Sequence, residues 1–102
     1  MTLAEVTQLV LTCLHDQLEE RGGQAPAGLD GSTRLIGRDA VLDSLGLVGL
    51  IVDVEQRLGE EHGIGVTIAD ERAMSQTHSP FRTADTLAAY VQTLIREQRV
   101  DA

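Results

Sequence analysis

Apolar residues recur at intervals of three and four in three stretches of this chain, and that spacing predicts three long helices. The first helix opens on a capping-box pattern, in which Thr2 bonds the N–H group of Glu5 and Glu5 reaches back. The other two are predicted over residues 44–58 and 83–99. The chain has one Phe, one Tyr and no Trp, so Leu, Val, Ile and Ala must build the core. The sequence therefore predicts an all-α fold.

The middle helix carries more apolar residues than one buried face requires. Its predicted core face holds Leu47, Leu50, Ile51, Val54 and Leu58. Leu45, Val48 and Val52 fall on a second face, about 130° away around the helix. One helix of so small a domain is rarely buried on both sides, so we expect this second face to be open to a partner. The alternative is that the long connection before the helix covers it.

The connection before this helix, residues 22–39, is rich in glycine and shows no sustained period. A loop of this length in a compact domain is usually functional or mobile. Its apolar residues, with those just after it, are expected to pin it to the core; they are Leu29, Leu35, Ile36, Val41 and Leu42. It contains no glycine-rich phosphate-binding motif.

Gly63 is predicted to end the middle helix, and residues 64–68 read as a short extended segment. Residues 70–74 have the pattern of a helix of one or two turns, and Phe81 is expected to return to the core. The predicted architecture is one domain over residues 1–102. It is a small four-helix bundle, with three long helices, one short helix and a long first connection.

The chain is acidic, with 16 Asp and Glu against 8 basic residues and a formal net charge of −8. Binding to a phosphate backbone needs clustered basic residues, so no nucleic-acid partner is expected. The same charge favours encounter with basic protein surfaces, although acidity also serves solubility alone.

Cys13 is the only cysteine, which excludes an intrachain disulfide and favours a reducing compartment. It lies in the apolar stripe of the first helix, where a small buried hydrophobic residue is expected. The first residues lack the pattern of a signal peptide, and no apolar run approaches a membrane span. We therefore expect a cytoplasmic protein with no membrane span.

A polar pair, Asp43 and Ser44, stands between apolar residues where the middle helix begins. Either residue type is a favoured N-cap, which is the simplest explanation. A hydrolase would need a base and an oxyanion site near the serine, but His15, His62 and His78 are scattered along the chain. These histidines also lack metal-ligand spacing, so neither catalysis nor a metal site is expected. The remaining functional reading is that Ser44 accepts a group attached by another enzyme.

The chain resembles an acyl carrier protein over essentially its whole length. The resemblance rests on Asp43-Ser44-Leu45 opening an apolar helix, with Val54-Glu55 and Leu58 following at similar spacing. The long first connection, the short helix near residue 70 and the last helix also match the order of elements in that family.

This resemblance implies that Ser44 carries 4′-phosphopantetheine, transferred from coenzyme A by a Mg²⁺-dependent phosphopantetheinyl transferase. It implies a monomer, without catalytic activity, that presents acyl or aminoacyl thioesters to loading ligases and acyl-transferring enzymes. The residues that it assigns to recognition by the transferase and other partners are Asp43, Leu45, Val48, Val52 and Glu55. Peptidyl carriers usually have glycine before the serine, so Asp43 favours the acyl type.

Two departures from the family pattern suggest a dedicated partner. Gly46 and Gly49 stand where fatty-acid carriers commonly have acidic residues, and they lower helix propensity. Residues 74–82 also form a longer link than usual before the last helix, which either reshapes the acyl cavity or a docking surface, or is a tolerated insertion. The alternative function is a helical interaction module that kept the bundle but is not modified.

Overall fold

The computed structural model describes residues 1–20, 28–36, 41–68 and 80–100. Three helices account for most of this part of the chain: α1 (Leu3–Glu20), α2 (Ser44–His62) and α4 (Ala84–Val100). The predicted short helix at residues 70–74 lies outside the described residues. The all-helical class is confirmed, and the structure is consistent with a small bundle. No helix in the described ranges is long and apolar enough to cross a membrane.

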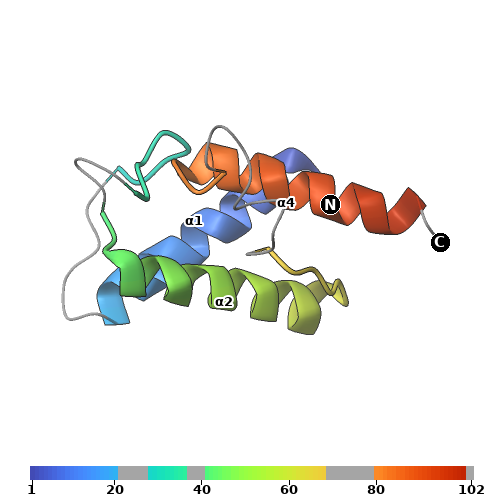
Figure 1. The fold of residues 1–102 in the computed structure, drawn as a ribbon, viewed down its shortest axis with the longest axis horizontal. Coiled ribbons are helices and arrows are strands. Elements are labelled where there is room, and N and C mark those ends of the chain that lie inside the picture. Colours follow the sequence, from blue (N-terminus) through green and yellow to red (C-terminus); the bar gives the residue numbers. More distant parts are fainter. Residues whose placement is uncertain (21–27, 37–40, 69–79, 101–102) are drawn as a thin grey trace.

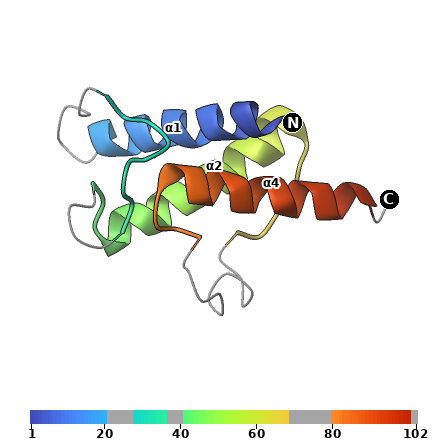
Figure 2. The same cartoon turned by 90° about the horizontal axis from the view of Figure 1, so that it is seen from above.

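Helix α1 is the central element, because it packs against both α4 and α2. Figure 1 shows α1 running between the other two helices, and Figure 2 shows the same three helices from above. Figure 2 shows the start of α1 near the end of α2, and Met1 and Glu5 line the same cleft as Glu61 and His62, so these two helices run in opposite directions. The core is formed by side chains with at most 2% exposure from all three helices, including Val10, Leu14, Leu50, Leu58, Leu87 and Ile95.

The start of α1 has the predicted capping box. Thr2 N donates to Glu5 Oε1 at 2.8 Å, and Glu5 N donates to Thr2 Oγ1 at 3.2 Å. The backbone N–H group of Thr2, and to a smaller extent its hydroxyl, stabilise the ionised carboxylate and lower the pKa of Glu5. The stripe that follows is buried as predicted at four positions, Val6, Val10, Cys13 and Leu14, but Leu3 at its beginning is 49% exposed.

Helix α2 extends four residues beyond the predicted end at residue 58. Gly59 is accommodated within the helix, which ends where Gly63 adopts φ 65°, a left-handed conformation that suits glycine. Gly63 N donates to Gly59 O and Ile64 N donates to Leu58 O, so the last turn is closed by two backbone bonds. Gly63 was correctly predicted as the stop, and the helix simply uses the acidic residues before it as its last turn.

The described part of the long connection is anchored on the start of α4. Arg34 and Thr83 form an antiparallel bridge, and Leu35 N donates to Arg82 O at 2.9 Å. Leu35 and Leu42 are buried, and Leu29, Ile36 and Val41 are partly buried against the core, which confirms the predicted anchors. Phe81 is buried as expected, and Tyr90 is buried as well.

Candidate functional site at the start of α2

The N-cap of α2 is Asp43, and Ser44 is the first helical residue. Asp43 has extended backbone angles, φ −88° and ψ −177°, and its Oδ1 accepts from Gly46 N at 2.7 Å. Its carbonyl oxygen accepts from Leu47 N at 2.9 Å, as the first bond of the helix. The capping role that could explain a polar residue here is therefore supplied by Asp43.

The residues on both sides of Ser44 are open to solvent. Asp43 is exposed, although its carboxylate is held by the cap bond, and the side chain of Leu45 is 69% exposed. Asp43 and Leu45, the residues that flank Ser44, are therefore accessible to another protein.

The two predicted faces of α2 differ as expected. Leu50, Val54 and Leu58 have no exposed surface, Ile51 is 8% exposed, and Leu47 is partly buried. On the other face, Leu45, Val48 and Val52 are 55–69% exposed and, with Leu3, are the large hydrophobic residues that stand out from the described surface. We call Leu45, Val48 and Val52 the outer face of α2. The described part of the connection does not cover it.

The charged residues of α2 beside the outer face have partners within the chain. Glu55 Oε2 accepts from Ile68 N at 2.7 Å, which ties the segment after the helix back onto it. Asp53 Oδ1 lies 3.4 Å from Arg57 Nε, and Glu60 Oε1 accepts from Gln56 Nε2 at 3.3 Å. Glu55, predicted as a recognition residue, thus has a structural bond that the sequence did not reveal.

Gly46 and Gly49, which the sequence marked as departures, lie at packed positions. Gly46 is buried, and a Cβ there would lie 3.1 Å from Leu42 Cδ2. At Gly49 a Cβ would meet the end of the Gln17 side chain of α1, which would have to move aside. Gly46 therefore lies against the residues that precede α2, and Gly49 faces α1.

Arg57 links α2 to α1. Its Nη2 donates to Asp16 Oδ2, and its Nε faces Asp53 within α2. The hydrogen bond to Asp16 raises the pKa of Arg57, which stays protonated in any case.

Cys13 of α1, which lies near Arg57, is fully buried. Burial, with the nearby charge of Asp53 as a smaller cause, raises the pKa of Cys13 to about 12. Its thiol is therefore neutral and enclosed at physiological pH.

A cleft of about 280 Å³ lies between the first half of α1 and the end of α2. It is lined by Met1, Glu5, Gln8, Leu9, Thr12, Arg57, Glu61 and His62. Its lining residue on α2 nearest to Ser44 is Arg57, about 20 Å further along the helix. This cleft is therefore separate from the start of α2.

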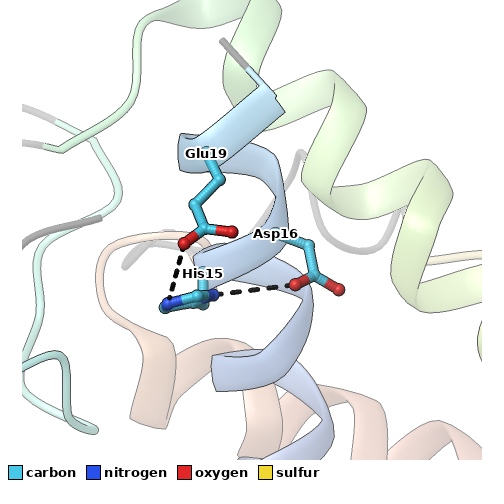
Figure 3. A group of neighbouring side chains, drawn as sticks. All are labelled: His15, Asp16 and Glu19. Atoms are coloured by element: carbon cyan, nitrogen blue, oxygen red, sulfur yellow. Dashed lines mark ion pairs between the residues drawn. The ribbon is translucent and has the colours of Figure 1, made fainter. Parts of the chain in front are cut away.

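One side-chain cluster was not predicted from the sequence. On α1, His15 lies between Asp16 and Glu19, as Figure 3 shows. The signal in the sequence is a carboxylate four residues after a histidine, which a comparison of the three histidines with one another does not reveal. His15 and His62 are exposed as expected, and His78 lies outside the described residues.

We found no match to this chain among protein-family models, curated proteins or solved structures.

Proposed function

We propose that this protein carries acyl or aminoacyl groups as thioesters on 4′-phosphopantetheine attached to Ser44. The observation that supports this most directly is the start of α2. There a serine that is not the N-cap stands between exposed residues, and an exposed apolar face begins one residue later. Modification by one enzyme and recognition by others would then use the same end of one helix.

The residues around Ser44 fit a phosphodiester. The first turn of a helix favours negative charge, through its free N–H groups and the aligned peptide dipoles. In the proposed transfer, the Ser44 hydroxyl oxygen forms a bond to the phosphorus of the phosphopantetheine group of coenzyme A. The bond to 3′,5′-ADP breaks, 3′,5′-ADP leaves, and the hydroxyl proton passes to a base of the transferase. Mg²⁺ belongs to that enzyme in this proposal.

The chain has no thiol of its own that is suited to hold a thioester, so the proposed arm would have to supply one. Cys13 is the only cysteine, and it is buried with its pKa raised to about 12. Because the thiolate is the nucleophilic form, this residue is unsuited to hold a thioester. The attached arm would supply the terminal thiol that holds the cargo.

The outer face of α2 is the proposed docking surface for the transferase, the loading ligase and the acyl-transferring enzymes. Leu45, Val48 and Val52 offer apolar side chains next to the attachment point, and Asp43 lies beside it. Glu55 is only half-buried, so it can also border this surface while it holds Ile68. Burial of apolar side chains against a partner is the main favourable contribution expected here.

Intact-mass analysis after incubation with coenzyme A and a broad-specificity phosphopantetheinyl transferase tests the proposal. We expect wild type and Ser32→Ala to gain one phosphopantetheine, and Ser44→Ala to gain none. Ser32 is a suitable control because it is exposed and far from α2 in sequence. The number of reactive thiols in the native protein should rise from none to one on modification.

An unmodified wild-type protein, or equal modification of Ser44→Ala, would show that the assignment is wrong. An unmodified protein that still binds a partner independently of Ser44 would favour the interaction module instead.

A further inference from the structure

The cluster on α1 brings one imidazole and two carboxylates together on the surface. One ligand atom each from His15, Asp16 and Glu19 can be chosen so that all lie within 4.8 Å of one another (Figure 3). His15 is 50% exposed and Glu19 is 55% exposed, so an ion from solvent can reach both. Because all three residues belong to one regular helix, their backbone positions are fixed before any ligand binds.

The distance between His15 and Glu19 fits two ligands of one metal ion. His15 Nε2 lies 3.5 Å from Glu19 Oε1, one helical turn further on. This exceeds the usual N–H···O hydrogen-bond length of about 2.7–3.2 Å. Bonds of about 2.0–2.1 Å to a tetrahedral ion place two ligand atoms about 3.3–3.4 Å apart. The observed distance is close to that span.

The other side of the imidazole faces Asp16, which is itself held in place. Asp16 Oδ1 lies 3.6 Å from His15 Nδ1, and a shift of about half an ångström would bring the pair to hydrogen-bond distance. The second oxygen of Asp16 accepts from Arg57 of α2. A carboxylate behind a metal-binding histidine fixes the ring orientation and raises its basicity. The tie to α2 therefore positions the group that would orient His15.

We propose that His15 Nε2 and Glu19 Oε1 bind a divalent first-row transition cation such as Zn²⁺, with Asp16 orienting the imidazole. Mixed imidazole and carboxylate ligands suit these cations, and water completes the coordination. The site lies on α1 and is independent of any modification of Ser44.

Titration of the full chain with Zn²⁺ alone, followed by calorimetry, tests the proposal. Wild type should bind one ion, and His15→Ala and Glu19→Gln should each bind at least about tenfold more weakly. Asp16→Asn should weaken binding less, because it changes the orientation of the ring and leaves both ligands in place. Far-UV circular dichroism should be unchanged in all three variants, since His15 and Glu19 are exposed and an asparagine oxygen at position 16 can still accept from Arg57.

The matched control is the double variant His62→Ala/His78→Ala, which leaves His15 as the only histidine. It should bind Zn²⁺ as wild type does, and Ser44→Ala should do so as well. The proposal is wrong if wild type binds no Zn²⁺ below about 1 mM, or if His15→Ala binds as tightly as wild type. It is also wrong if the double variant loses binding.

Discussion

The two faces of α2 have similar side chains but opposite environments. Val54 on the inner face has no exposed surface, whereas Val48 on the outer face is 56% exposed. Burial of a valine side chain stabilises a fold by roughly 1.5–3 kcal/mol, and an exposed valine forgoes most of that. The same residue type therefore serves folding on one face, and on the other face it is available for binding. Hydrophobic content alone does not distinguish these roles, but position around the helix does.

The largest expected effect comes from placing a charge on the inner face. Val54→Asp would bury a carboxylate with no partner among the apolar side chains of the core, at a cost of about 4–5 kcal/mol or more. This is comparable to the whole stability of a small domain. Far-UV circular dichroism and urea unfolding should show an unfolded or strongly destabilised protein. A folded variant with unchanged stability would show that Val54 does not belong to the core.

The same substitution on the outer face should leave the fold intact and impair function. We expect Val48→Asp to change the free energy of unfolding by no more than about 0.5 kcal/mol, because the side chain faces solvent. Under the proposed function it should slow phosphopantetheine transfer by about tenfold or more, since it places a charge in an apolar docking surface. The rate of mass gain measures this. If Val48→Asp unfolds, Val48 belongs to the core and the division of α2 is wrong.

The dependence of stability on alkaline pH tests whether Cys13 is buried. Its folded pKa of about 12 lies above the model-peptide value of 9.0, so the folded state keeps a proton that the unfolded state loses. This contribution to stability is present below about pH 9 and declines above it. The loss between pH 7.5 and pH 10 is on the order of 1 kcal/mol.

Urea unfolding at several pH values, with Cys13→Ala as the control, measures this effect. The variant should lack that part of the decline, whereas any contribution from Tyr90 is common to both proteins. Parallel pH profiles for the two proteins would show that Cys13 is less enclosed than the structure indicates.

The smallest expected effect is the difference in stability between variants of Asp43 and Ser44, the two polar residues at the start of α2. Asp43→Ala removes the bond to Gly46 N and should destabilise the protein by about 1 kcal/mol. Ser44→Ala should change stability by less than about 0.5 kcal/mol, because the cap is Asp43. Thermal or urea unfolding of the two variants measures the difference. The reverse order would mean that Ser44 caps the helix.

Periodicity predicted the parts of the fold that depend on local sequence. The two faces of α2, the capping box at Thr2, the burial of Cys13 and the stop at Gly63 all follow from rules that act within one or two helical turns. The helix was predicted to reach about residue 58, and α2 continues through Gly59 to His62. Burial of Leu58 and closure of the last turn at Gly63 outweigh the low helix propensity of one glycine.

Contacts between distant segments were not predictable from spacing. Glu55 binding Ile68, Arg57 binding Asp16, and Gly49 beside Gln17 each depend on how two segments meet in three dimensions. In the candidate site, the sequence identified Ser44 and its neighbours, but it left open which polar residue caps the helix. Gly46 and Gly49 had been interpreted through missing charges and low helix propensity, because the contact of Gly49 with Gln17 joins segments remote in sequence.

The anchored connection also affects how the start of α4 exchanges with solvent. First-turn amides of a helix have no partner within the helix and usually exchange quickly. Here Ala84 N donates to Thr33 O and Asp85 N donates to Gly31 O at 2.8 Å, both from a segment about fifty residues earlier. These two amides open only when the connection detaches from α4. Deuterium uptake at this helix start therefore reports on the attachment of the connection.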